Sequence, residues 1–314
     1  MAMQSTSERA LSCLAYSSCS IAMVLSNKAL AASFPVQLPI MLVLLQCALA
    51  VLLGETCRGL NVVQYKRFRL ATAAIWLPVN VCFVAMLLTS FMSFKFLNVP
   101  MITVFKNLTN VIIVAGDWYW HGQKVTIGVL LTFGVMVIGA LAAAYTDAMF
   151  SAEGYLWMSS NCVATASYVL YMRSVTTRDD VDLSKFEMVF YNNLLSIPLL
   201  LPVSLALGEV GVLMDNLPVV LSWSFVSVNL IAGSMGFFLN LASLWCVGST
   251  SATTYALVGS VNKIPVSLLG VLLFDAVVTS QSAAYIAVSM AGGFIYTYVK
   301  LLESRGAKES PRTT

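Results

Sequence analysis

The sequence predicts an all-α membrane protein with ten transmembrane helices in two inverted five-helix repeats, and three observations carry this prediction. Hydrophobic residues make up 59% of the 314 residues and charged residues only 10%, whereas an average soluble domain has about 25% charged residues. The apolar residues gather in runs of about 20, the length that crosses a bilayer. Lys and Arg lie almost entirely on one side of these runs. This composition excludes a soluble enzyme and a disordered chain.

Ten apolar segments, separated by polar stretches, follow one another along the chain. Because most connections are very short, as at 146–152, neighbouring helices are expected to pack antiparallel. The predicted spans are 11–32, 38–54, 71–92, 100–118, 125–145, 153–173, 185–207, 219–247, 252–274 and 281–302.

The parts outside the spans are too short to fold separately, since a domain usually needs at least ~50 residues. The chain is therefore expected to divide into a cytosolic N-terminus (1–10), a first repeat (11–145), a second repeat (153–302) and a cytosolic basic tail (303–314). An odd number of spans in each repeat inverts the second relative to the first, as in many secondary transporters.

Basic residues predict the orientation of the spans. With the N-terminus in the cytosol, the cytosolic side receives 13 Lys and Arg residues and the opposite side receives only Lys95. Because the number of spans is even, both termini are then cytosolic. The cytosolic basic residues are Arg9, Arg58, Lys66, Arg67, Arg69, Lys124, Arg173, Arg178, Lys185, Lys300, Arg305, Lys308 and Arg312.

Three lysines fall inside the predicted spans, namely Lys28, Lys106 and Lys263. A lysine at this depth costs a few kcal/mol unless it is paired or hydrated. The 14 acidic residues lie in loops or at span ends, so the spans themselves offer these lysines no counter-ion. An anionic ligand is the simplest missing partner. For Lys28, near the luminal end of its span, snorkelling to the interface is the favoured alternative.

The fourth span places Thr103, Lys106, Asn107 and Asn110 at i, i+3, i+4 and i+7, which is one helical face. This face is expected to line a central cavity for an anion. The alternative is that the lysine binds neighbouring backbone carbonyls.

The ninth span, in the corresponding place of the second repeat, carries a similar stripe at i, i+4, i+7 and i+8. It consists of Tyr255, Gly259, Asn262 and Lys263. Gly259 lets a ligand or helix approach the backbone, and Pro265 leaves a carbonyl unpaired beside Asn262. The adjacent Lys and Asn in both spans support the internal repeat.

The seventh span contains Phe190, Tyr191, Asn192 and Asn193 in succession. An asparagine offers a donor and an acceptor to one edge of a heterocycle, which suits the mixed pattern of guanine. The alternative is that the two amides join helices, a contact worth about 1 kcal/mol each.

Catalysis and metal binding have no support in the sequence. His121 is the single histidine and is assigned to a cytosolic turn, no carboxylate lies within the membrane interior, and no phosphate-binding glycine loop is present. We therefore predict no catalytic residue, no metal, no cofactor and no nucleic-acid partner.

Several motifs together resemble those of the Golgi GDP-mannose transporters, ten-helix nucleotide-sugar transporters of the drug/metabolite transporter superfamily. The two most specific are the sequence at 190–193, an intact FYNN, and Gly259-Ser260-Val261-Asn262-Lys263, which corresponds to the family's GALNK with two replacements. The resemblance also includes 20–28, 105–108 and 253–255.

This resemblance implies roles for individual residues. Asn192 and Asn193 would read the guanine, in a slot shaped by Phe190 and Tyr191. The diphosphate and sugar would meet residues from several spans, namely Lys106, Lys263, Gly259, Ser260, Asn262, Tyr255 and Tyr16. Asn240 stands where a serine commonly faces the sugar, and Ile102 replaces an expected tyrosine, so sugar selectivity is less firmly implied than nucleotide recognition.

The resemblance implies a secondary active transporter that moves GDP-mannose from the cytosol into the Golgi lumen in exchange for GMP by alternating access. The alternatives are a transporter of another GDP-sugar, such as GDP-fucose or GDP-arabinose, or of a phosphorylated metabolite. A polytopic enzyme acting on lipid-linked sugars is the alternative from a different class. The expected surroundings are the lipid bilayer of the Golgi, and a homodimer is left open.

Overall fold

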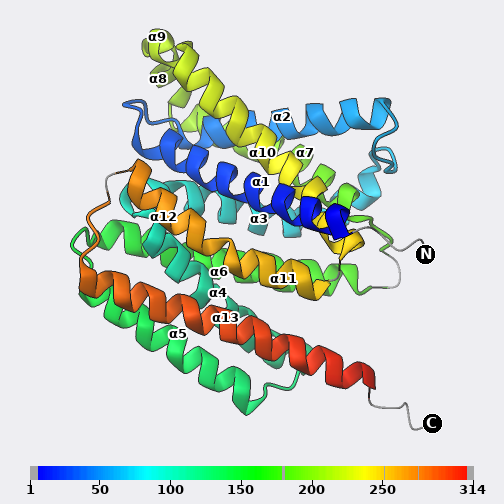
Figure 1. Cartoon of the computed structure of the whole chain (residues 1–314). Helices are drawn as coiled ribbons and strands as arrows, with labels where there is room; N and C mark the ends of the chain where they lie inside the picture. The colour runs from blue at the N-terminus through cyan, green and yellow to red at the C-terminus, as the bar shows by residue number, and fades with distance from the viewer. Residues whose placement is uncertain (1–5, 179–180, 251, 275, 310–314) are drawn as a thin grey trace. The chain divides into compact units, whose positions relative to one another are not determined.

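The computed structural model describes residues 6–178, 181–250, 252–274 and 276–309, and these residues are helical or irregular, without a strand (Figure 1). The helices are α1 (Thr6–Ala32), α2 (Pro39–Gly59), α3 (Leu70–Phe96), α4 (Val99–His121), α5 (Ile127–Tyr145), α6 (Ala152–Thr176), α7 (Lys185–Ala206), α8 (Glu209–Asp215), α9 (Leu217–Val220), α10 (Trp223–Ser249), α11 (Ala252–Val261), α12 (Lys263–Leu273) and α13 (Ser280–Glu309). The all-α prediction is confirmed. The first five residues of the predicted N-terminus and the last five of the predicted tail lie outside the described residues.

The ten predicted spans overlap these helices, but not all are uninterrupted apolar helices. Eight helices are long and apolar enough to cross a membrane, namely α1 to α5, α7, α10 and α13. α6 coincides with the sixth predicted span without belonging to these eight. The ninth predicted span is two shorter helices, α11 and α12, which separate at Asn262. The chain is thus a multi-pass membrane protein.

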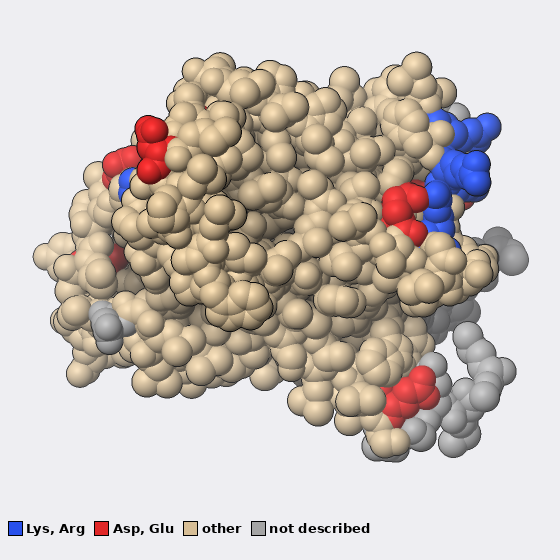
Figure 2. Space-filling model, turned by 90° about the horizontal axis from the view of Figure 1, so that it is seen from above, with Lys and Arg blue, Asp and Glu red and all other residues tan. Residues whose placement is uncertain are grey.

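The surface agrees with this assignment. On the face drawn in Figure 2, nearly all of the surface belongs to uncharged residues, and the charged side chains lie at its margins. An uncharged surface of this kind suits contact with lipid, where charged side chains are costly.

The described residues form two compact units, and each unit is built from both halves of the sequence. Unit 1 contains Met1–Ser18, Asn98–Phe150 and Ala242–Thr314, and unit 2 contains Cys19–Leu97 and Ser151–Leu241. In unit 1, α5 packs along α13 (Figure 1), and α4 contacts α5, α12 and α13. In unit 2, α3 packs along α6, and α2 packs along α7.

Small residues set the close approach of α5 and α13 in unit 1. A side-chain carbon at Gly139 would lie 2.7 Å from the backbone nitrogen of Ser289, and one at Gly292 would lie 2.7 Å from Cγ of Met136. Such contacts let two helix backbones approach closely in a membrane, where van der Waals packing is a main source of association.

Replacing Gly139 by alanine is expected to destabilise the protein by about 2 kcal/mol, because the added methyl group meets a backbone that cannot move aside. Gly134 on the same helix has no atom within 4 Å of the corresponding position, so Gly134→Ala is the matched control. Thermal unfolding in detergent should show a lower melting temperature for Gly139→Ala only. Equal melting temperatures for the two variants would contradict the close packing of α5 on α13.

Candidate functional site

The predicted site residues are divided between the two units. The predicted guanine-binding residues lie in unit 2, and the predicted phosphate- and sugar-binding residues lie in unit 1, except for Asn240. Each set is therefore described within its own unit.

Lys263 in unit 1 has a neutral partner. It lies in the first turn of α12, and its Nζ donates a hydrogen bond to Oδ1 of Asn107 on α4. Asn107 is completely buried. Among the described residues no carboxylate pairs with Lys263, and the charge that acts on it comes from Lys106, which has the same sign. In unit 1 the fourth and ninth predicted spans therefore contact each other through Asn107 and Lys263.

The helix break at Asn262 leaves a buried polar atom beside Lys263 without a hydrogen-bond partner among the described residues. Pro265 lacks the N–H that would bond to the carbonyl of Val261. The Asn262 side chain is 4% exposed, and its Oδ1 has no hydrogen-bond partner among the described residues. A buried acceptor without a donor costs about 1–3 kcal/mol. The break therefore offers an acceptor suited to a hydroxyl group of a ligand.

Three of the predicted sugar-binding residues meet at the N-terminal half of α1. The rings of Tyr16 and Tyr255 lie with their centroids 4.6 Å apart. A side-chain carbon at Gly259 would lie 3.1 Å from the Tyr16 hydroxyl, so the glycine provides the space for this tyrosine. The Ser260 hydroxyl is 2.7 Å from that of Thr297 on α13, which gives Ser260 a partner within the protein.

Three other predicted residues have less distinctive surroundings. The Thr103 hydroxyl donates to the carbonyl of Val99 at 3.0 Å, within its own helix. Asn110 is half-buried on α4. Asn240 donates to the carbonyl of Gly236 at 2.8 Å, again within its own helix.

Lys28 has a structural environment in unit 2. It is buried, and its Nζ donates to the carbonyls of Phe94 and Leu97 at 2.6 and 2.7 Å. These carbonyls lie at the C-terminus of α3, where the helix dipole favours a cation. The predicted snorkelling is not what the structure shows, since the ammonium group binds the end of a neighbouring helix.

The Asn192 amide in unit 2 is hydrogen-bonded on both sides. Its Oδ1 accepts from Trp76 Nε1 at 2.8 Å, and its Nδ2 donates to the Tyr168 hydroxyl at 2.7 Å. Its backbone carbonyl accepts from Asn80 Nδ2 at 2.7 Å and from the Ser196 hydroxyl at 2.6 Å. A base could bind this amide only by replacing Trp76 and Tyr168 as its partners.

The sequence prediction missed these partners of Asn192. Trp76 and Asn80 are one helical turn apart in the third span, and Asn192 and Ser196 are one turn apart in the seventh. Two polar stripes of this kind would have indicated that α3 and α7 meet along them.

The other residues of the 190–193 motif differ in exposure. Asn193 is half-buried, and its Nδ2 donates to the carbonyl of Val189 in its own helix at 2.8 Å. The Phe190 ring lies 5.1 Å from that of Tyr65. Tyr191 is only 2% exposed and belongs to the hydrophobic core of unit 2. Of the two asparagines, Asn193 is the one that needs to give up fewer contacts to bind a ligand.

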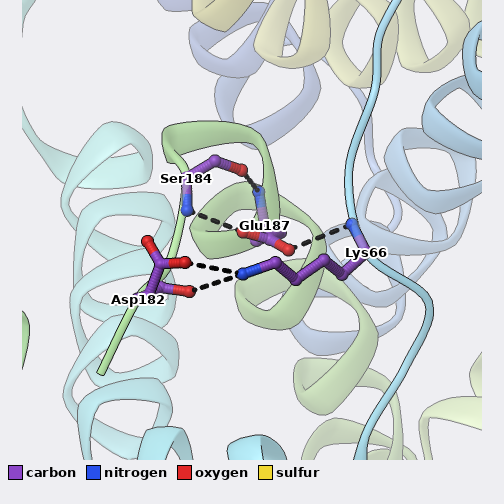
Figure 3. A network of polar contacts seen from close by, with 4 residues as sticks. All are labelled: Lys66, Asp182, Ser184 and Glu187. Carbon is purple, nitrogen blue, oxygen red and sulfur yellow. Dashed lines mark hydrogen bonds and ion pairs between the residues drawn. The ribbon is translucent and has the colours of Figure 1, made fainter. Parts of the chain in front are cut away.

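Polar contacts fix the start of α7 to the connection between α2 and α3 (Figure 3). The Glu187 carboxylate is 3% exposed and accepts from the backbone N–H groups of Ser184 at 2.7 Å and Lys66 at 3.0 Å. Ser184 completes a capping box with Glu187. The hydroxyl of Tyr191 accepts from the backbone N–H of Arg69 at 2.9 Å. The 190–193 motif is therefore positioned from its first turn.

An exposed ion pair extends this network. Lys66 Nζ lies 2.7 Å from Oδ2 of Asp182, and both residues line a small pocket of about 150 Å³ together with Arg69, Glu187 and Tyr191. The Lys66 hydrogen bond and charge hold the pKa of Asp182 below its ordinary 3.8, and Asp182 raises the pKa of Lys66 above its ordinary 10.5. The stabilisation by Asp182 is lost only as the pH falls below 3.8, and that by Lys66 only as it rises above 10.5, so the pair is constant from about pH 5 to pH 9.

Replacing Glu187 by glutamine is expected to destabilise unit 2 by about 1–3 kcal/mol, because an amide NH₂ would face a backbone N–H where the carboxylate accepted a bond. Asp182→Asn is the matched control. It breaks an exposed ion pair and should leave the melting temperature unchanged at pH 7, since exposed pairs contribute little. If both variants unfold at the same temperature, the buried carboxylate does not hold the start of α7.

Comparisons with known proteins cover most of the chain. The sequence model of the Triose-phosphate Transporter family matches residues 8–297. The chain is 33% identical over 316 residues to the GDP-mannose transporter of Aspergillus niger, which covers 96% of this chain and 81% of the relative. It is 34% identical to GDP-mannose transporter 1 of Emericella nidulans (95% and 82%) and 37% identical to the GDP-mannose transporter GONST1 of Arabidopsis thaliana (93% and 89%).

Proposed function

The chain belongs to the Triose-phosphate Transporter family, and we propose that it carries GDP-mannose from the cytosol into the Golgi lumen in exchange for GMP. Members of such a family are transporters, so no enzymatic activity is assigned. The observation that carries the proposal is Lys263, an ammonium group inside a membrane protein whose hydrogen-bond partner is an amide. The names of the relatives supply the nucleotide and the sugar.

The two substrates share the features that the proposed residues would recognise. GMP carries close to two negative charges at pH 7, and the diphosphate of GDP-mannose also carries two. Lys263 and Lys106, whose charges act on each other, match this pair of charges. Asn193 and Asn192 would read the guanine that both substrates contain, and the free acceptor of Asn262 would bind a ribose or sugar hydroxyl.

Inverted repeats would let one such site open alternately to each side of the membrane. The packing supports this part of the proposal, because three contacting pairs each join a span of the first half to its counterpart in the second. These pairs are α2 with α7, α4 with α12 and α5 with α13. Cytosolic termini and a Golgi location complete the proposal, and a homodimer stays a prediction that light scattering would test.

Uptake of labelled GDP-mannose into liposomes that contain the purified protein tests the proposal directly. Preloaded GMP should stimulate uptake at least tenfold, and unlabelled GMP, but not UMP, should compete. Equal competition by GDP-fucose or GDP-arabinose would widen the substrate to GDP-sugars. Uptake blocked by inorganic phosphate or a small phosphorylated metabolite, and not by GMP, would instead favour a phosphate-metabolite carrier. Formation of a new sugar product by the purified protein would instead favour the alternative of a polytopic enzyme that acts on lipid-linked sugars.

A further inference from the structure

Asn107 is held in a fixed position against α13. It is completely buried, and its Nδ2 donates to the carbonyl of Ser289 at 3.4 Å. A side-chain carbon at Gly293 would lie 2.8 Å from Oδ1 and 3.1 Å from Nδ2 of Asn107, so only a glycine leaves room for the amide. With its nitrogen bound to α13, the amide directs its oxygen to Lys263.

The chemistry of this partner is informative. An asparagine oxygen accepts a hydrogen bond from the Lys263 ammonium but brings no negative charge. An aspartate would have nearly the same shape and would neutralise the lysine permanently. Among the described residues, the charge acting on Lys263 is that of Lys106, which has the same sign. The structure thus satisfies the hydrogen bonding of Lys263 while leaving its charge uncompensated.

We propose that Asn107 is an uncharged hydrogen-bond acceptor that positions Lys263, and that the absence of a negative charge on Asn107 makes the exchange obligatory. This inference rests on the proposed function. An uncompensated ammonium group is costly in a membrane, and the phosphate of either nucleotide removes that cost. The carrier without a bound nucleotide therefore changes slowly from facing one side of the membrane to facing the other, whereas the carrier with a bound nucleotide makes this change quickly. Asn107 is a positioning residue in this scheme, and Gly293 provides its space.

Asn107→Asp tests the proposal because it adds a counter-ion with almost no change of shape. Uptake of GDP-mannose into liposomes without internal GMP should rise from background to within about threefold of the rate with GMP. The apparent affinity for GMP should fall about tenfold, since the new carboxylate competes with phosphate for the same ammonium. A merely structural role of Asn107 would lower both rates together and leave the requirement for GMP intact.

Asn98→Asp is the matched control. Asn98 begins α4, where its side chain accepts from the backbone N–H of Met101 at 2.8 Å, and an aspartate caps a helix equally well. The same change on the same helix, about 13 Å away along its axis, should leave the strict requirement for GMP unchanged. If Asn98→Asp also relaxed the requirement, the effect would come from charge in general and the proposal would be wrong.

Gly293→Ala provides a second test without a new charge. The added methyl group should displace the Asn107 amide, raise the KM for GMP several-fold and keep the exchange strict. Binding gives a parallel readout, because Asn107→Asp should need about tenfold more GMP than the wild-type protein or Asn98→Asp for the same rise in melting temperature. A strict requirement for GMP in folded Asn107→Asp would overturn the proposal. Wild-type uptake that ignores internal GMP would overturn the exchange on which it rests.

Discussion

Lys263→Ala is expected to lower the exchange of GDP-mannose and of GMP about 100-fold. The substitution removes a charge-assisted hydrogen bond to phosphate, and such a bond is worth about 1.5–3 kcal/mol, where each 1.4 kcal/mol is a factor of ten. Both substrates should be affected because phosphate is common to both. Initial rates of labelled GDP-mannose uptake and of GMP efflux in liposomes measure the effect.

A lysine elsewhere on the chain controls for the loss of a charge. Lys95 is exposed near the end of α3, with its Nζ 5.0 Å from the centre of the Phe96 ring. Lys95→Ala should retain wild-type exchange, and both variants should remain folded in detergent. Exchange by Lys263→Ala within threefold of the wild-type rate would remove this lysine from the substrate site.

Asn192→Ala is expected to abolish the preference for guanine nucleotides over uracil nucleotides. In the proposed complex the guanine replaces Trp76 and Tyr168 as the partners of the Asn192 amide. Two hydrogen bonds to the base contribute about 1 kcal/mol each, so the affinity for GMP should fall at least tenfold while the affinity for uracil nucleotides stays unchanged. Competition of GMP and UMP against labelled GDP-mannose measures the preference. The variant should also be less stable, because the buried Trp76 indole N–H loses its acceptor and the Tyr168 hydroxyl loses its donor.

Trp76→Phe separates recognition from stability. It removes the indole donor and leaves the Asn192 side chain in place, so the melting temperature should fall while the preference for guanine persists. Equal loss of the preference in Trp76→Phe and Asn192→Ala would mean that Asn192 acts by packing α7 against α3, and that the base is read elsewhere.

Local sequence patterns predicted the helices well, because the length and polarity of an apolar run depend only on residues that are neighbours in the sequence. The apolar runs alone placed the spans. The structure adds the caps, since Asn98, Thr126, Ser151 and Ser184 each cap the helix that follows. The break at Asn262 followed less directly from the sequence. Pro265 indicated an unpaired carbonyl, but only the structure shows that the helix divides there.

The hydrogen-bond and packing partners of side chains were harder to predict than the helices, because a contact between distant segments produces no pattern in the sequence of either segment alone. The stripe on the fourth span placed Asn107 and Lys106 on one helical face, which stays a prediction. Nothing in the sequence indicated that Gly293, almost 190 residues later, makes room for Asn107. Similarly, the paired amides at 192 and 193 looked equivalent, yet one is fully engaged within unit 2 and the other is half-buried.

The composition of the two units has a consequence for how the chain is made. α4 and α5 are synthesised roughly 100 residues before α11 to α13, the helices that complete their unit. At 5–20 residues per second this interval lasts roughly 5–20 s. During that time Lys106 and Asn107 sit in the membrane or the translocon without the surface of α13. A chain that stops after α10 leaves this polar face uncovered, and cellular quality control should degrade it. The two halves, made as separate polypeptides, should accumulate only when they are produced together.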